Sequence, residues 1–290
     1  MGTAKIIVCT HKPGFVLDND LFMPLQVGKA VSGTNLGFQG DDTGDNISLK
    51  NPNYCELTGM YWAWKNLRDV DYVGLAHYRR YFRFQGMEKW KNVEDGQTIL
   101  VNPVKELSGY DVILPSPWRM EQSVADAYVY AHVMEDFYIM NRVILRHYPD
   151  YEKTMVDFFF RSNKWIGYNM FFSSWSWFDS YCRWLFPILA EIESHVRIST
   201  YSFQKRVFGF MGELLLPLYC LHNGFKIKYL PLVFVGGKNI VGMMNNIRLD
   251  ALSVRNTLKF LMMRPKHKNI SSRGLLCHID TYFKQDGIII

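Results

Sequence analysis

The sequence lacks any apolar run approaching the roughly 18 residues that a transmembrane helix requires. Its start also lacks the basic region, apolar stretch and small-residue cleavage site of a secretory signal, because residues 5–9 form only a short strand-like run. Cysteine is scarce, with 5 residues in 290, and no pair has the C-x-x-C spacing of zinc and redox sites. These absences predict a cytoplasmic protein whose thiols are buried and unpaired.

Several motifs of common enzymes are also absent. The sequence contains no phosphate-binding P-loop, no G-x-G-x-x-G fingerprint, no G-x-S-x-G elbow and no H-E-x-x-H pair. This weakens the case for a nucleotidase, a dehydrogenase, an α/β hydrolase or a zinc protease. With 48% hydrophobic and 21% charged residues, the chain is typical of a globular protein with one large α/β domain or two lobes that share a cleft.

Positive charge is in excess, with 33 Lys and Arg residues against 27 Asp and Glu residues and a net charge of +6. This surplus would favour binding of anionic partners such as nucleotide diphosphates or lipid headgroups. The equally good alternative is that the basic residues form a surface that contacts only solvent. No nucleic-acid-binding motif is present and most basic residues are scattered, so nucleic acid is not predicted as a partner. The basic residues that gather near the C-terminus are Arg255, Lys259, Arg264, Lys266, Lys268 and Arg273.

Strand-like and helix-like segments alternate through the first half of the chain, a pattern typical of a mostly parallel sheet flanked by helices. A single helix is predicted over residues 52–67, because Asn51 can cap it and apolar side chains recur every three or four residues. The second half is predicted to be more helical, with a helix over residues 202–221 that is interrupted at Gly209 and Gly212. The predicted strands cover residues 5–10, 71–76, 110–114, 167–172 and 226–234.

Polar clusters follow directly after two predicted strands, those over residues 5–10 and 71–76. Ligands of open α/β sheets collect at the carboxyl ends of the strands. Arginine offers a planar fork of donors that suits phosphate, and histidine can add a further donor. The alternative for the arginines is contact with helix-end carbonyls or nearby acids at the surface. The side chains predicted to bind phosphate are Thr10, His11, Lys12, His77, Arg79 and Arg80.

An acidic, glycine-containing segment precedes the helix predicted to follow Asn51. Its carboxylates could bind a divalent cation or, with a neighbouring amide, the hydroxyls of a ribose. The spacing does not match an EF-hand, and such clusters are also common simply as turns and helix caps. The predicted donor-binding residues here are Asp42, Asp45, Asn46 and Lys50, and the ligands of the alternative metal site are Asp41, Asp42 and Asp45.

One acidic residue lies within the helix predicted over residues 202–221. Glu213 could be a general base that removes a proton from an acceptor hydroxyl. The alternative is a glutamate in a first helical turn, where the helix dipole favours negative charge, and the spacing does not separate the two. Arg206, earlier in the same segment, joins the predicted phosphate-binding residues.

Several segments together resemble the DUF4422 family of bacterial capsule and exopolysaccharide glycosyltransferases. They are 41–48 (Asp-Asp-Thr-Gly-Asp-Asn-Ile-Ser), 53–66 (Asn-Tyr-Cys-Glu-Leu-Thr-Gly-Met-Tyr-Trp-Ala-Trp-Lys-Asn), 77–82 (His-Tyr-Arg-Arg-Tyr-Phe) and 168–171 (Tyr-Asn-Met-Phe). The resemblance spans residues 4–235 and implies a GT-A-like α/β fold, with the nucleotide sugar bound by residues 1–118 and the acceptor by residues 119–240. Residues 241–290 are predicted to form a basic helical extension.

The resemblance also implies a reaction. Some members of the family are similar to galactofuranosyltransferases that use UDP-galactofuranose, so this UDP-sugar is the implied donor. GT-A enzymes usually end the strand after the nucleotide-binding helix with Asp-x-Asp, which holds a divalent metal against the diphosphate. This sequence has His77-Tyr78-Arg79 at the equivalent place. We therefore expect cationic side chains to replace the metal, so that no cofactor is required, with Mn²⁺ or Mg²⁺ as the alternative.

The same comparison assigns roles on the acceptor side. Glu213 stands where inverting GT-A enzymes carry their base, so inversion of the anomeric configuration is expected. Asn169, with Tyr168, stands where related folds contact donor or acceptor, although a hydrogen-bonded amide in the core explains Asn169 equally well. Trp62 and Trp64 belong to the family pattern and are expected in the core.

A lipid-linked oligosaccharide is the implied acceptor, which would bring the enzyme to the inner face of the plasma membrane. Residues 258–268 combine apolar and basic side chains, so they could form a peripheral membrane anchor or, alternatively, a helix that packs on the core. The rival to an enzyme is a non-catalytic module, a degenerate transferase fold that binds a glycan or an anionic lipid.

Overall fold

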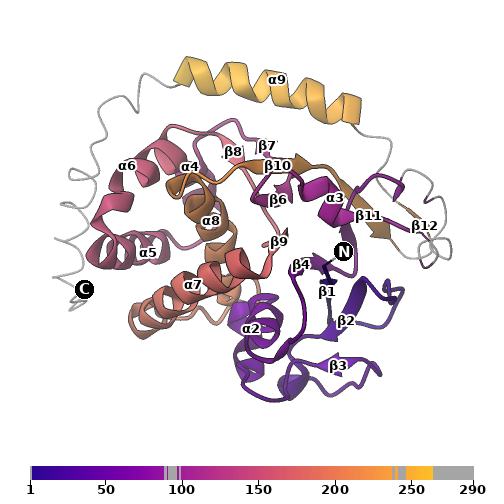
Figure 1. Cartoon of the computed structure of the whole chain (residues 1–290). Helices are drawn as coiled ribbons and strands as arrows, with labels where there is room; N and C mark the ends of the chain where they lie inside the picture. Colours follow the sequence, from indigo (N-terminus) through magenta and orange to yellow (C-terminus); the bar gives the residue numbers. More distant parts are fainter. Residues whose placement is uncertain are drawn as a thin grey trace.

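The fold is built around one mixed sheet. The computed structural model describes residues 2–87, 90, 97, 99–236, 239–240 and 246–263. Within these residues the strands follow the order β10-β6-β9-β4-β1-β2-β3 (Figure 1). β1 (Ala4–Thr10) lies between β2 (Phe22–Gln26) and β4 (Tyr72–His77) and runs parallel to both.

The other strands complete a sheet that is mostly parallel, as predicted. β9 (Phe171–Ser174) is antiparallel to its neighbours β4 and β6 (Val112–Pro115), whereas β10 (Ile227–Leu230) is parallel to β6. The remaining strands of the sheet are β3 (Gln39–Gly40), β5 (Arg80–Phe82), β11 (Leu232–Gly236) and β12 (Asn239–Ile240). A separate two-stranded ribbon pairs β7 (Trp118–Arg119) with β8 (Lys164–Trp165).

Each face of the sheet packs against its own hydrophobic core. Side chains alternate along a strand, so that Ile7 and Cys9 of β1 enter one core while Ile6 and Val8 enter the other. The larger core is covered by helices, and the smaller one by α3 (Pro103–Leu107) with β5 and β11 (Figure 1). The covering helices are α2 (Leu57–Asn66), α4 (Val124–Ala131), α5 (Met134–His147), α6 (Glu152–Met155), α7 (Trp175–His195) and α8 (Val207–His222). Trp62 and Trp64 pack in or against the larger core, as expected.

The predicted helix over residues 52–67 is in fact two helices. α1 (Asn51–Tyr54) ends at Cys55, whose φ of 52° lies in the left-handed region, and α2 starts two residues later. The Asn51 side-chain amide stabilises this break by donating to the Cys55 carbonyl at 2.8 Å. No proline or glycine marks the break, so helical periodicity runs through it without interruption.

Two further predictions are corrected by the structure. α8 is continuous through Gly209 and Gly212, where an interruption was predicted. These glycines instead permit close approach, because a Cβ on Gly209 would lie 3.0 Å from Cys55 Sγ and one on Gly212 would lie 2.6 Å from Asn169 Oδ1. The strand predicted over residues 226–234 is divided at Pro231 into β10 and β11, because proline supplies no N–H to a continuing ladder.

The C-terminal helix α9 (Asn246–Met263) lies across the β7–β8 ribbon (Figure 1). Asn256 Nδ2 donates to the Arg119 carbonyl at 2.8 Å, and Phe260 is only 6% exposed. None of the described helices is both long and apolar enough to cross a membrane. The basic residues predicted after position 263 lie outside the described residues.

Candidate active site

Basic side chains converge where β1 and β4 end. His77 is the last residue of β4, and its Nε2 lies 2.7 Å from the Tyr168 carbonyl oxygen. His11, just after β1, packs edge-on against Tyr78 with ring centroids 5.5 Å apart. Burial lowers the pKa of His11, and the positive charges of Lys12, Arg206, Arg79 and His77 lower it further. The side chains that follow the two strands therefore gather in one cluster, whose positive charges include Lys12, Arg79 and Arg206.

Arg80 borders this cluster from β5. Its guanidinium lies over the Tyr168 ring at 4.3 Å, and its buried Nε has no hydrogen-bond partner among the described residues. A buried unpaired donor is costly unless a ligand or water completes it. Thr10 differs, because it is fully buried and its hydroxyl donates to the Lys12 carbonyl at 3.2 Å. Thr10 thus shapes the loop, which corrects its prediction as a phosphate contact.

Glu213 faces this region from α8. The pKa of Glu213 is raised to about 7, first by burial and then by the nearby negative charge of Glu56. Hydrogen bonds from the Tyr168 backbone and the Trp165 side chain, and the positive charge of Arg206, act in the opposite direction. Gly167 lies close to this carboxylate, because a Cβ added to it would be 3.3 Å from Glu213 Oε2. Glu213 lies well inside α8, so the first-turn explanation for this residue is wrong.

Glu56 is a second carboxylate of the site, and sequence reasoning missed it. Asn169 Nδ2 donates to Glu56 Oε1 at 2.7 Å and to the Gly209 carbonyl at 2.9 Å, so the Asn169 amide ties the break before α2 to α8. The break at Cys55 is what turns Glu56 toward α8. Glu56 appeared in the family pattern, but no local sequence signal distinguished it from a helical surface residue.

Backbone strain is concentrated here. Cys55, Tyr168 and Asn169 have φ values of 52°, 78° and 51°, in the region that side chains other than glycine rarely adopt. Strained residues persist where the surrounding contacts fix them, and they gather at functional sites. Arg206 adds one such contact, because its Nε donates to Cys55 Sγ at 3.2 Å.

Comparison with known proteins identifies the family. Residues 5–224 match the family described as "Domain of unknown function (DUF4422)". The chain belongs to the DUF4422 family. The solved apo structure of the WbbM bifunctional glycosyltransferase is similar, with a TM-score of 0.72 and 32% sequence identity, and the match covers 84% of this chain and 47% of that one. The DUF4422 chain thus spans about half the length of the WbbM chain. No curated protein sequence matches it.

The acidic segment of the DUF4422 pattern supports the fold. Asp41 is fully buried, and its carboxylate accepts from the backbone of Gly28 (2.9 Å), the backbone of Lys29 (3.0 Å), the Thr58 hydroxyl (2.6 Å) and the Ser48 hydroxyl. A carboxylate has about four acceptor sites, so these donors occupy all of them. Asp41 therefore holds the loop together, which corrects its prediction as a metal ligand.

The other polar residues of this segment bond to nearby residues or face solvent, and none is recorded in contact with Glu213. Asp45 Oδ1 accepts from the Tyr61 hydroxyl at 3.1 Å, Asn46 Oδ1 accepts from a backbone N–H at 3.1 Å, and Asp42 is exposed. Lys50 forms an ion pair with Glu193 of α7. Among the described residues, no group of three or more His, Cys, Asp or Glu side chains could hold a metal ion.

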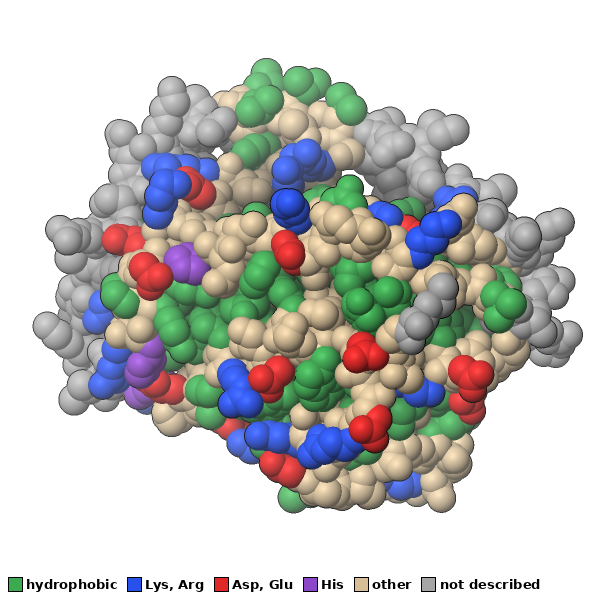
Figure 2. Space-filling model, viewed as in Figure 1, with side chains coloured by type: hydrophobic (Ala, Val, Ile, Leu, Met, Phe, Trp, Pro, Cys, Tyr) green, Lys and Arg blue, Asp and Glu red, His purple; other side chains and the backbone are tan. Residues whose placement is uncertain are grey.

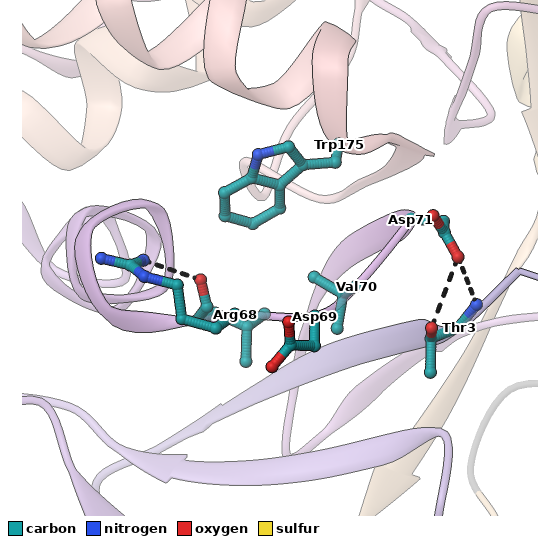
Figure 3. A pocket seen from close by; sticks show the side chains of 7 residues that line it. Thr3, Arg68, Asp69, Val70, Asp71 and Trp175 are labelled. Atoms are coloured by element: carbon teal, nitrogen blue, oxygen red, sulfur yellow. Dashed lines mark hydrogen bonds between the residues drawn. The ribbon is translucent and has the colours of Figure 1, made fainter.

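A surface hollow occupies the opposite edge of the sheet, before the start of β1 and β4 (Figure 3). The Asp71 carboxylate accepts there from the Thr3 backbone at 2.7 Å, and the Arg68 guanidinium donates to backbone carbonyls at the end of α2 (Figure 3). These polar groups are already paired by the fold. The DUF4422 chain therefore has its stronger candidate site at the carboxyl ends of the strands.

Proposed function

We propose that this chain is a glycosyltransferase, which moves a sugar from a nucleotide donor to a glycan acceptor. The observation that carries the proposal is a carboxylate, Glu213, whose pKa of about 7 suits a general base at neutral pH, beside a cluster of cations. Lys12, Arg79 and Arg80 supply the positive charge that a departing diphosphate requires. Similarity to the WbbM bifunctional glycosyltransferase supports the same reaction class.

The proposed reaction is a single displacement. The acceptor hydroxyl gives its proton to Glu213 as its oxygen bonds to the anomeric carbon, while the bond from that carbon to the diphosphate oxygen breaks. The configuration is therefore inverted, and the nucleoside diphosphate leaves with its charge stabilised by the cation cluster. The negative charge of Glu56 raises the pKa of Glu213, which makes the ionised Glu213 carboxylate a stronger base, and Glu56 also accepts a hydrogen bond from Asn169.

The proposed donor is UDP-galactofuranose, and no metal is required. Hard divalent cations take oxygen ligands. β4 instead ends in His77, and the next charged residues are Arg79 and Arg80, so the side chains at this place do not fit such an ion. Asp41, the most buried carboxylate of the acidic segment, is already saturated by protein donors.

A donor screen tests this proposal. The purified protein is incubated with a panel of UDP-sugars, including UDP-galactofuranose, and candidate glycan acceptors, with and without EDTA, and UDP release is measured. Turnover with one donor that survives EDTA is expected, with inverted configuration in the product by NMR. Retained configuration would exclude Glu213 as the base, and EDTA-sensitive turnover would return attention to Asp42 and Asp45. Absence of turnover with every donor would favour the non-catalytic binding module.

The acceptor is proposed to be lipid-linked, with α9 resting on the membrane that holds it. The docked side of α9 contacts Arg119, while its outer side carries an apolar stripe (Figure 2). The stripe and its exposed fractions are Val254 (62%), Leu258 (57%), Leu261 (49%) and Met262 (80%). An apolar stripe on a net-positive protein suits an anionic lipid surface.

Vesicle binding tests this contact. The double variant Leu258→Glu/Met262→Glu is expected to lose most binding to vesicles that contain phosphatidylglycerol, whereas Leu100→Glu, at a 94% exposed residue that is not part of α9, should bind as the wild type does. Equal binding by both variants would exclude α9 as the contact.

A further inference from the structure

Three aromatic rings beside the active site have no part in the reaction proposed above. His132, which follows α4, contacts Phe203 with ring centroids 5.6 Å apart and Phe210 with centroids 4.0 Å apart, both in stacked orientation. Phe203 and Phe210 also contact each other, at 5.1 Å. We call these three residues the aromatic shelf.

The aromatic shelf borders Glu213. Phe210 and Glu213 are three residues apart on α8, so their side chains share one side of the helix. The Arg206 guanidinium lies 5.2 Å from the Phe210 ring centre while its Nε reaches Cys55, the neighbour of Glu56. Phe210 and Glu213 therefore lie on one side of α8, and Arg206 connects Phe210 to Cys55.

Phe203 leaves one side of the aromatic shelf open to solvent. Phe203 is 53% exposed, and Tyr201, two residues before it, is 76% exposed. A phenylalanine ring has no polar atom to hydrate, so exposure of this ring leaves apolar surface in water that a ligand could cover. The His132 ring is held in place by the Gln204 side chain at 3.4 Å, and Gln204 Nε2 donates to the Ala131 carbonyl at 2.9 Å.

The chemistry of such a surface selects a particular ligand. A sugar ring has one face of C–H groups that packs on an aromatic ring, while its hydroxyls need hydrogen-bond partners at the edge. Arg206, at the edge of the shelf, supplies guanidinium donors.

We propose that the aromatic shelf is a subsite for the acceptor glycan, in which a sugar ring stacks on Phe203 and places the attacking residue of the glycan at Glu213. This inference rests on the proposed glycosyl transfer. It assigns acceptor recognition to His132 at the end of α4, to α8 and to the residues just before α8, whereas the strand ends would hold the donor.

The kinetic test compares substitutions of Phe203. Phe203→Ala is expected to raise the acceptor KM by about tenfold or more, equivalent to about 1.4 kcal/mol of binding. UDP release from the donor without acceptor should not change, and Phe203→Trp should restore the KM because it keeps an aromatic face. Tyr110→Ala, at a tyrosine 45% exposed before β6, is the matched control. An unchanged acceptor KM in Phe203→Ala would overturn the proposal.

A binding experiment separates this proposal from the proposed reaction. Saturation-transfer NMR is recorded on the wild type and on Phe203→Ala with trisaccharides of galactose, glucose and mannose. Binding of one trisaccharide that is lost in Phe203→Ala supports the shelf even if no donor is turned over, in which case only the transferase proposal fails. The shelf is excluded if the wild type binds none of the three, or if the variant binds equally well.

Discussion

Two polar regions, the acidic segment of residues 41–50 and the cluster at the ends of β1 and β4, differ in how their side chains are paired. In the acidic segment, Asp41 accepts four hydrogen bonds and Lys50 is held by Glu193. In the cluster region, the buried Arg80 Nε and Asn169 Oδ1 lack partners within the described part of the chain. Since buried polar groups are normally paired, the cluster region is the one of the two whose buried polar groups still have room for a further partner.

Replacement of the proposed base is expected to have the largest effect. Glu213→Gln should reduce turnover by about 10²–10⁴-fold, because general-base catalysis contributes about that much. The fold should be retained, since the substitution removes a charge that burial disfavours. UDP release measures the rate of turnover, and circular dichroism shows whether the variant keeps its fold. Asp150→Asn, at an exposed carboxylate paired with His222, is the control and should keep full activity.

The acidic segment should respond in stability instead. Asp41→Asn is expected to lower the free energy of unfolding by about 2–4 kcal/mol. The carboxylate of Asp41 accepts hydrogen bonds from backbone N–H groups, and the amide of Asn would place its own N–H group against one of these donors. Asp42→Asn, at an exposed residue, should change it by less than about 0.5 kcal/mol. Urea unfolding measures the free energy of unfolding of both variants. Equal stability of the two variants would contradict the structural role given to Asp41.

The interaction between Glu213 and Glu56 should affect how kcat/KM depends on pH. Glu213 acts as a base when ionised, so kcat/KM should rise with pH through its pKa of about 7. The negative charge of Glu56 contributes to that raised pKa, so Glu56→Gln should move the rise to lower pH. Gln can still accept from Asn169. An unmoved profile would remove Glu56 from the site, and Asp157→Asn serves as the control for a distant exposed carboxylate.

The smallest effect is expected at Lys50. Lys50→Ala breaks a partly exposed ion pair with Glu193, which should cost less than about 1 kcal/mol of stability and leave turnover unchanged. Thermal unfolding and UDP release measure the two quantities. A large rise in donor KM would instead restore Lys50 as a donor-binding residue, and the contrast between the two polar regions would weaken.

The sheet and the cation cluster could be predicted from the sequence because both follow local signals, namely strand-like runs and the polar residues that end them. The prediction failed where distant contacts decide the local structure. The left-handed Cys55 depends on Arg206 and on the close passage of Gly209, far along the chain. Glu56 could not be recognised for the same reason, since only the break at Cys55 brings it to Asn169.

The direction of β9 has a consequence for how substrate preference could be altered. An antiparallel strand enters the sheet at the edge where its parallel neighbours leave it, so Tyr168 and Asn169, which precede β9, arrive beside His77 at the end of β4. The chain thus delivers site residues from its second half through a short connection rather than through a strand. Exchanging residues 166–169 between relatives would therefore reshape the site while every ladder of the sheet is kept.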